Sequence, residues 1–151
     1  EMCIRDRRLF LPKSFEKLTY CGLGPVESYV DKHRASYHGV FNSTPAEQQE
    51  DYIRPQENGS HFGCARVTIT DGAGAVTVTS PEDFSFNLSH YTQEEMTEKM
   101  HNYELTESPD NVFCFDCKMS GVGSNSCGPR LAKAMQFDDE TFTFKFDLTV
   151  E

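Results

Sequence analysis

The sequence predicts an all-β fold, an antiparallel β-sandwich with one short helix near residues 92–102. Three observations support this fold class: apolar and polar residues alternate over residues 141–150, β-branched runs flank a glycine-rich turn, and phenylalanines recur two residues apart in two further segments. Side chains two residues apart lie on the same face of a strand, so each segment has one apolar face. These faces require a shared interior.

The clearest predicted strand covers residues 141–150. Its apolar residues are Phe142, Phe144, Phe146, Leu148 and Val150, and the residues between them are polar or charged. We expect the apolar set to face the core and the polar set to face solvent.

Other strands are predicted at 15–20, 66–70, 75–80 and 112–119, the second and third joined as a hairpin by residues 71–74 (DGAG). The period of two places Phe84, Phe86 and Leu88 on one face of a strand, and Phe113, Phe115, Cys117 and Met119 on one face of another.

The predicted helix begins after Thr92. Thr92 and Glu95 have the spacing of a capping box, and Met96, Met100 and Tyr103 follow at helical intervals. We expect about three turns, ending near residues 101–102, with both methionines as packing residues rather than cofactor ligands.

Residues 31–63 are polar and rich in turn residues. A stretch of this length without predicted strands is expected to lie across other surfaces of a larger protein.

Composition argues against two classes of partner. Fourteen Lys and Arg against 24 Asp and Glu give a net charge of -10, which repels the phosphates of nucleic acid and of anionic lipid. No apolar stretch approaches the roughly 20 residues that span a bilayer. We therefore expect neither nucleic acid nor membrane as a partner.

The cysteines do not predict a metal site. They are Cys3, Cys21, Cys64, Cys114, Cys117 and Cys127. Only Cys114 and Cys117 form a C-x-x-C, with no second pair or nearby His to complete four zinc ligands, and in a strand this spacing places the thiols on opposite faces. Scattered thiols indicate a reducing, cytoplasmic compartment, with periplasmic export through an upstream signal as the alternative.

Residues 1–7 (EMCIRDR) show no periodicity and resemble a translated sequencing-adapter run. We interpret them as non-native, so that residues 8–151 carry the protein, and we expect that protein to continue upstream.

The first candidate segment follows the strand predicted at 15–20. Its residues are Gly22, Gly24, Pro25, Glu27 and Tyr29. The glycines and proline are expected to force a tight turn that aims the Glu and Tyr side chains in a fixed direction. A structural ion pair of Glu27 with Lys32 or Arg34 is favoured over a catalytic role.

The second candidate segment, residues 54–59 (RPQENG), contains Pro55, Glu57, Asn58 and Gly59. Asn58 and Gly59 suit positive φ, and the Glu57 side chain is expected to accept hydrogen bonds from backbone amides of the turn.

The third candidate segment covers residues 120–130 (SGVGSNSCGPR). Gly121 and Gly123 suggest a phosphate loop, but there is no Lys and no G-x-G-x-x-G register, and Pro129 stands where a helix would start. We therefore do not expect a phosphate-binding loop in this segment. A loop with Ser124, Asn125, Ser126 and Cys127 exposed remains, which either rims a polar ligand site or connects strands.

Four segments in this order resemble the C-terminal β-sandwich domain of glycoside hydrolase family 2 β-galactosidases: residues 22–31 (GLGPVESYVD), 54–63 (RPQENGSHFG), 84–91 (FSFNLSHY) and 116–131 (DCKMSGVGSNSCGPRL). The resemblance covers about residues 15–150. It implies a partial galactose-mutarotase-like sandwich near the end of a longer enzyme.

The resemblance also implies a role. The full enzyme would hydrolyse terminal β-galactosides of the lactose type with retention, using two Glu residues about 5 Å apart on an upstream TIM barrel that this chain lacks. No catalytic residue and no cofactor are therefore expected here, and the resemblance allows Mg²⁺ or Na⁺ in the full-length enzyme. Its partners would be the upstream domains, the galactoside and other copies of the parent.

In some family members the glycine-rich loop brings a Trp to the active-site mouth. The matching residue here is Cys127, whose thiol offers much less stacking area than an indole, so the alternative is sugar contact through Ser124, Asn125 or Ser126.

Two other function classes remain as alternatives. A stand-alone carbohydrate-binding module usually presents Trp or Tyr platforms, and this chain has no Trp. A small aldose mutarotase would need His and carboxylate groups that converge in a pocket, and the five His residues show no grouping in sequence.

Overall fold

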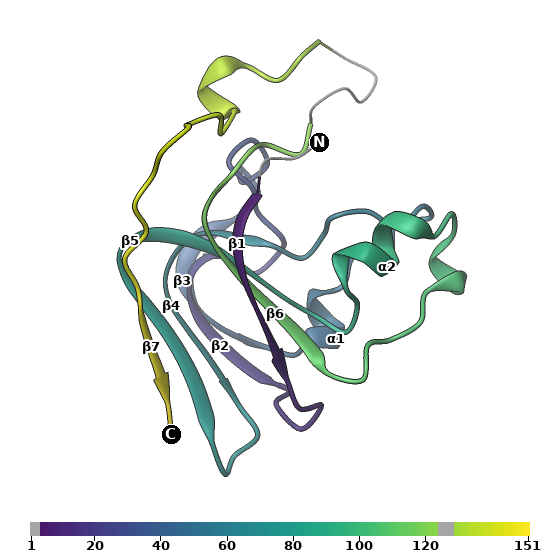
Figure 1. The fold of residues 1–151 in the computed structure, drawn as a ribbon, viewed down its shortest axis with the longest axis vertical. Coiled ribbons are helices and arrows are strands. Elements are labelled where there is room, and N and C mark those ends of the chain that lie inside the picture. The colour runs from purple at the N-terminus through teal and green to yellow at the C-terminus, as the bar shows by residue number, and fades with distance from the viewer. Residues whose placement is uncertain (1–3, 124–128) are drawn as a thin grey trace.

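The computed structural model describes residues 4–123 and 129–151, whose backbone forms a seven-stranded antiparallel sheet (Figure 1). The strands are β1 (Ile4–Leu11), β2 (Lys17–Gly24), β3 (Tyr37–Ser43), β4 (His61–Thr70), β5 (Ala75–Ser89), β6 (Asn111–Met119) and β7 (Asp147–Val150). Their order is β1-β6-β5-β4-β2-β3, and β7 pairs with β5. The helices have only 4 and 6 residues. The predicted all-β class is confirmed, and the curled sheet is consistent with a β-sandwich.

β5 is the central strand and organises the sheet. β4 pairs along one of its edges, and the other edge is shared by β6, opposite residues 85–89, and β7, opposite residues 76–79. The strands curl around a common interior, and the short helices lie beside the sheet (Figure 1).

The core is formed by the inward faces of β2, β4, β5 and β6, together with the last residue of β1. Its buried members are Leu11, Leu18, Tyr20, Cys64, Val67, Ile69, Val76, Val78, Phe84, Phe86, Leu88, Phe113 and Phe115. Aromatic rings pack edge to face within it, as Tyr20 does against Phe86 with ring centroids 5.1 Å apart. The predicted core faces of the strands around residues 84–88 and 113–115 are confirmed.

The hairpin between β4 and β5 agrees with the prediction, because Thr70 pairs with Ala75 across the turn at residues 71–74. The predicted strands at 75–80 and 84–88 are, however, parts of one strand, β5. Pro81 lies in the stretch between the paired segments, where the register of β4 against β5 shifts. A proline is tolerated there because no ladder hydrogen bond requires its missing N–H.

The tight turn predicted at Gly22–Pro25 is wrong. β2 runs through Gly24, so both glycines are strand residues that pair with β3. A Cβ on Gly22 would overlap Cys64, and one on Gly24 would overlap the Tyr20 hydroxyl. These glycines are needed for close packing, and the change of direction begins only at Pro25.

Residues 31–63 contain two elements that the sequence did not predict. β3 adds an outer strand to β2, and α1 (Pro45–Gln48) follows it, capped by the Thr44 hydroxyl, which accepts a hydrogen bond from Glu47 N. That this stretch lies across other surfaces of a larger protein stays a prediction.

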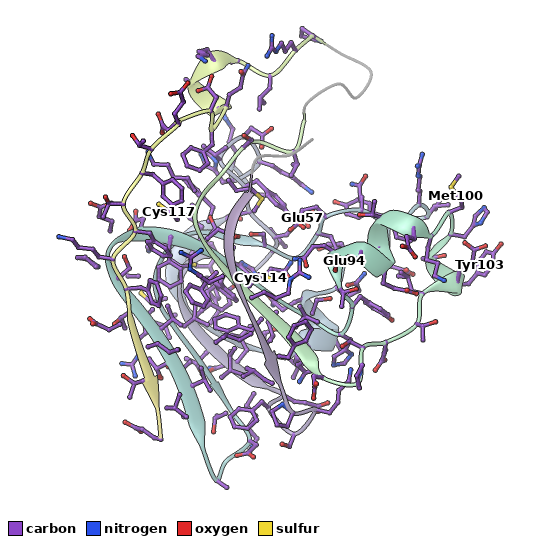
Figure 2. The ribbon with its side chains drawn as sticks, in the orientation of Figure 1. Glu57, Glu94, Met100, Tyr103, Cys114 and Cys117 are labelled. Carbon is purple, nitrogen blue, oxygen red and sulfur yellow. The ribbon has the colours of Figure 1, made fainter. Side chains whose placement is uncertain are left out.

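The helix predicted near residues 92–102 is shorter than expected. Thr92 caps α2 (Gln93–Glu98) as predicted, but a 3₁₀ turn, η1 (Asn102–Glu104), replaces the later turns. Met96 is buried, whereas Met100 is 56 % exposed, so its predicted packing role is wrong. Met100 and Tyr103 point away from the sheet at the far end of this region (Figure 2).

The strand predicted at 141–150 is mostly absent. Only Asp147–Val150 forms β7, and Leu148 and Val150 are exposed on it. Phe144 and Phe146 do pack against the core, but Phe142 is 40 % exposed. A further 3₁₀ turn, η2 (Lys133–Met135), lies earlier in this C-terminal stretch.

Candidate functional site

The structure brings together three of the segments that the sequence analysis singled out. The loop after β2 binds Gly59 through the carboxylate of Glu27, and it binds Val122 and Gly123 through the carboxylate of Asp31. We call this set of contacts the motif junction: Glu27, Ser28, Tyr29, Asp31, Asn58, Gly59, Ser60, Gly121, Val122 and Gly123.

Glu27 is the buried centre of one half of the junction, with its side chain 4 % exposed. One carboxylate oxygen accepts hydrogen bonds from the Lys32 ammonium and from the Tyr52 hydroxyl, the latter at 2.6 Å, and the other accepts from Gly59 N at 2.8 Å. The predicted ion pair with Lys32 is confirmed.

These contacts control the charge of Glu27. Burial alone would raise the pKa of this carboxyl, but hydrogen bonds from Lys32, Tyr52 and Gly59 outweigh burial and lower its pKa. The same carboxylate helps to raise the pKa of Lys32 against the effect of burial. Glu27 is therefore ionised at neutral pH with both oxygens engaged, as expected of a structural carboxylate and not of a nucleophile or general acid.

Ser28 and Tyr29 fasten the same loop to Ser60. The backbone N–H of Ser28 donates to Ser60 O at 2.7 Å, and Ser60 N donates to the Tyr29 hydroxyl at 3.5 Å. The Ser28 hydroxyl accepts from Phe62 N at 2.9 Å and donates to Leu23 O at 3.2 Å. The Tyr29 side chain is thus buried in the protein and does not point into solvent. Burial, followed by the charges of Glu57 and Glu27, raises its pKa.

Gly59 adopts φ 70°, the positive φ for which the sequence suits it. A Cβ at Gly59 would overlap the Gln48 carbonyl oxygen, so both the backbone angle and the space require glycine. The Asn58 side chain accepts from Glu50 N at 3.0 Å and donates to Gln56 O at 2.9 Å.

Glu57 and Pro55 have different environments in this segment. Pro55 is buried, and Glu57 is half-buried near Tyr29. The predicted hydrogen bonds from turn amides to the Glu57 side chain stay a prediction, and the amide of Gly59 donates to Glu27.

Asp31 forms the other half of the junction. Its Oδ1 accepts from Val122 N at 3.1 Å and its Oδ2 accepts from Gly123 N at 2.9 Å. A Cβ on Gly121 would overlap the Asp31 carboxylate. The carboxylate thus holds the start of the glycine-rich segment.

The remaining residues of that segment lie partly outside the described structure. Ser124, Asn125, Ser126 and Cys127 fall outside the described residues. Pro129 is exposed and starts no helix.

A surface pocket of about 330 Å³ lies beside the junction. Its charged and polar lining comes from the loop after β2 and from residues 50–52: Glu27, Asp31, Lys32, His33, Arg34, Ser36, Glu50 and Tyr52. The pocket lining therefore contains both acidic and basic side chains.

His61 lies behind the junction and is buried. Its Nδ1 contacts Leu23 O at 3.0 Å, and its Nε2 contacts the Gln48 side chain. Burial lowers the pKa of His61 to about 4, although the Leu23 hydrogen bond opposes the shift. The ring is therefore neutral at pH 7 and fixes β2 against β4.

The sequence analysis missed Asp31, Gln48, Tyr52 and Ser60 as partners in this site. Asp31 ends the first resemblance segment, which could have drawn attention to it. The other three gave no signal, because their roles depend on contacts with residues distant in sequence.

Within residues 4–123 and 129–151, no three His, Cys, Asp or Glu side chains lie in an arrangement that could hold a metal ion. Of the helices described, none has the length and apolarity required to span a bilayer. Cys21, Cys64, Cys114 and Cys117 form no disulfide bond among the described residues, and burial raises the pKa of Cys64.

The chain is similar to known proteins over most of its length. The family described as beta galactosidase small chain matches residues 7–148. The chain is 47 % identical over 141 residues to a β-galactosidase of Actinobacillus pleuropneumoniae and 43 % identical over 140 residues to one of Staphylococcus xylosus. A β-galactosidase of Kluyveromyces lactis is 31 % identical over 144 residues.

These alignments cover 93 %, 93 % and 94 % of this chain but 14 % of each relative. The chain therefore spans about one seventh of the length of the relatives it matches.

Proposed function

Because this chain belongs to the β-galactosidase small-chain family, we propose that it is the C-terminal, non-catalytic β-sandwich segment of an enzyme that hydrolyses terminal β-D-galactosides of the lactose type. The observation that carries the proposal is the family match over residues 7–148. The enzyme would be a retaining glycosidase, with its two catalytic Glu residues in upstream domains.

The state of Glu27 supports a non-catalytic role for this segment. A retaining glycosidase needs one carboxylate free to attack the anomeric carbon and a second that exchanges a proton with the leaving oxygen. Both oxygens of Glu27 instead accept hydrogen bonds from the protein. Its low pKa further disfavours proton donation near neutral pH.

We assign the segment a role at the rim of the active site. Ser124, Asn125, Ser126 and Cys127 are the candidate residues that face the galactoside. Support comes from the fixed position of Val122 and Gly123, directly before them, against Asp31. Polar side chains at these positions would contact sugar hydroxyls by hydrogen bonds, because a Cys offers little surface for stacking.

The proposed partners follow from the parent enzyme. They are its upstream domains, its substrate and further copies of the parent in a homo-oligomer. We place the enzyme in the cytoplasm, where the four described cysteines, which form no disulfide bond, would stay reduced. The segment needs no cofactor under this proposal, and Mg²⁺ or Na⁺ would act elsewhere in the full-length enzyme.

A domain exchange tests the proposal. The matching region of the Actinobacillus pleuropneumoniae β-galactosidase is replaced by this chain, and hydrolysis of a nitrophenyl β-galactoside and of lactose is measured. We expect the exchanged enzyme to be active and the enzyme with the region deleted to be inactive. A folded exchanged enzyme with no more activity than the deletion would refute the proposal.

A second measurement uses the purified chain alone. We expect it neither to hydrolyse a chromogenic β-galactoside nor to accelerate galactose mutarotation. Turnover that copurifies with the chain and disappears on substitution of its own carboxylates would favour a complete small enzyme instead.

A further inference from the structure

Large apolar side chains gather at the end of the α2–η1 region that lies away from the sheet (Figure 2). Ile53 and Tyr103 are 81 % and 79 % exposed, more than any other large apolar side chain of the described residues, and Met100 is exposed beside Tyr103. Asn102 N donates to Ile53 O at 3.1 Å, so the loop that holds Ile53 lies against η1. We call Ile53, Met100 and Tyr103 the tip patch.

Hydrogen bonds hold the backbone of the tip patch in one shape. Glu104 Oε2 accepts from Met100 N and from His101 N, both at 3.0 Å. Asn102 Oδ1 accepts from Tyr103 N at 2.9 Å. The His101 and Tyr103 rings stack with their centroids 5.1 Å apart. A surface that is ordered before it binds loses little conformational entropy on binding, so a contact at the tip patch has a low entropic cost.

The tip patch has acidic surroundings. Residues 50–54 and 94–104 contain six acidic residues and two basic ones. The acidic residues are Glu50, Asp51, Glu94, Glu95, Glu98 and Glu104, and the basic ones are Arg54 and Lys99. Glu94 and Glu95 pair with Arg8 and Lys99, whereas Glu50, Asp51 and Glu98 have no ion-pair partner among the described residues. Charge complementarity therefore favours a partner surface with apolar side chains surrounded by Lys and Arg.

Two arguments exclude a second copy of this chain as the occupant of the tip patch. Two copies joined by symmetry at this patch would bring their acidic residues together, which is unfavourable. The patch is also small, because three side chains of this size present at most roughly 500 Å². Each partner of a stable intermolecular complex buries roughly 800 Å².

A surface within the same polypeptide removes the size limit. The region matched by this chain is 14 % of each relative, so most of such a polypeptide lies outside the chain. Domains linked in one polypeptide meet at a high effective concentration, and a small patch is then sufficient for docking.

We propose that the tip patch docks on the upstream domains of the same polypeptide, at a surface where apolar side chains are surrounded by Lys and Arg. The inference rests on the proposed function, because it requires the chain to be one segment of a larger enzyme. Tyr103 would be the anchor of the contact, since aromatic side chains supply much of the energy of such surfaces. The contact involves no substrate.

The test uses the active exchanged enzyme with Tyr103→p-benzoylphenylalanine, a photoreactive aromatic residue. Illumination joins this side chain to groups in contact with it, and mass spectrometry identifies the joined peptide. We expect a crosslink within one polypeptide, to an upstream peptide that contains Lys or Arg. No crosslink, or crosslinks confined to residues 8–151 of the same or another copy, would overturn the inference.

Two further positions make the crosslink specific. Ile53→p-benzoylphenylalanine should reach the same upstream surface and replaces the first variant if that one is inactive. Val150→p-benzoylphenylalanine is the matched control, because Val150 is equally exposed but lies on β7. Crosslinks from Val150 to the same upstream surface would show that contact there is not specific to the tip patch, and would overturn the inference.

Methionine oxidation gives a second readout in the unsubstituted exchanged enzyme. Met96 is buried and Met100 is exposed in this segment, and they are only four residues apart. If the tip patch is covered, hydroxyl radicals should oxidise Met100 roughly tenfold more slowly than free methionine, as they do a buried residue such as Met96. Oxidation of Met100 at the rate of free methionine would overturn the inference.

Charge reversal tests the stated chemistry of the partner surface. Glu98→Lys should repel a basic surface and lower the crosslink yield from position 103 by roughly fivefold or more. Glu82→Lys makes the same change of charge at an exposed position of β5 and should leave the yield unchanged. Equal yields in the two variants would contradict a basic partner and overturn the inference.

The failure of the inference is distinguishable from that of the proposed function. An active exchanged enzyme whose tip patch gives no upstream crosslink refutes the inference alone. An exchanged enzyme that is inactive before any substitution refutes the proposed function, and the inference with it.

Discussion

The Glu27 carboxylate accepts a hydrogen bond of 2.8 Å from the backbone N–H of Gly59, which joins two loops separated by 32 residues. Both groups are buried. A buried amide without an acceptor is costly, so the carboxylate satisfies a donor that water cannot reach. Because Lys32 and Tyr52 bind the other oxygen, one side chain joins three chain segments.

The first prediction concerns this carboxylate. Glu27→Ala should lower the free energy of unfolding of the chain by about 3 kcal/mol, because it leaves the Gly59 amide unsatisfied and removes the partner of Lys32. The control is Glu94→Ala, which removes an exposed ion pair with Arg8 and should cost no more than about 1 kcal/mol. Urea unfolding followed by circular dichroism measures both. Equal losses would show that Glu27 has no special structural role.

The second prediction compares two glycines with positive φ. Gly72→Ala should cost about 1–2 kcal/mol from backbone strain alone, since the nearest atom to its new Cβ is Lys17 Nζ at 3.7 Å. Gly59→Ala carries the same strain and also overlaps the Gln48 carbonyl oxygen. It should therefore cost about 1–3 kcal/mol more than Gly72→Ala. Thermal melts of the two variants decide this, and a Gly72 effect as large as that of Gly59 would contradict the steric argument.

Sequence patterns predicted the local parts of this fold well. The turn at residues 71–74, the Thr92 cap and the positive φ of Gly59 each depend on residues within a few positions of one another. The Glu27–Lys32 ion pair belongs to the same group. Each local preference is satisfied in the fold, as expected of a natural sequence.

The strand predicted at 141–150 failed for a reason that lies elsewhere in the chain. Alternation makes a segment suitable for a strand, but a strand also needs a free edge to pair with. On this edge of β5, β6 pairs along residues 85–89 and β7 along residues 76–79, while residues 80–84 between them, which include Pro81, pair with neither strand. Consequently only Asp147–Val150 pairs, while Phe144 and Phe146 pack without a ladder.

The junction could not be predicted for the same reason. Asp31 gives no local signal that it binds amides at Val122 and Gly123, and Gly22 suggested a turn because glycine is common in turns. Glycine is required at position 22 because Cys64 on the neighbouring strand β4 occupies the space that a Cβ would fill. The four segments that carry the family resemblance contain residues of the junction, whereas the contacts between these segments could be learned only from the structure.

The third prediction is a pH dependence of stability. The pKa of His61 is lowered to about 4 in the folded chain from an ordinary 6.5, so between these values the unfolded chain binds more protons. Stability is then complete above pH 6.5 and is lost as pH falls from 6.5 toward 4. Between pH 7 and pH 5 the loss from this one group should be about 2 kcal/mol.

Substitution separates His61 from other titrating groups. His61→Phe should lower stability at pH 7 but flatten its dependence between pH 7 and pH 5. His38→Phe, on the exposed face of β3, is the matched His-to-Phe control. The Glu27 contribution lies in a different window, since its lowered pKa means stability that is lost only as pH falls below about 4.5. If stability still depends on pH between pH 7 and pH 5 in His61→Phe, another group causes that dependence.

The fourth prediction concerns the uncovered edge of β3. In the described sheet β3 pairs only with β2, and its sequence YHGVFNS contains no Lys, Arg, Asp or Glu. β1, by contrast, has several charged residues, and β7 has only 4 residues. Uncharged edges that display apolar side chains pair readily with other chains, and Val40 is 69 % exposed on this strand.

We therefore expect the purified chain to self-associate through β3. Val40→Lys places a charge on that edge and should shift the chain toward monomer in sedimentation velocity, without lowering its unfolding midpoint. Val150→Lys puts the same charge on β7, where Val150 is 72 % exposed, and should change the association much less. Strand pairing at β3 must weaken when a charge is placed on β3 and not when the same charge is placed on β7. The prediction is therefore contradicted if the unmodified chain is a monomer at tens of micromolar. It is also contradicted if both variants dissociate the chain equally.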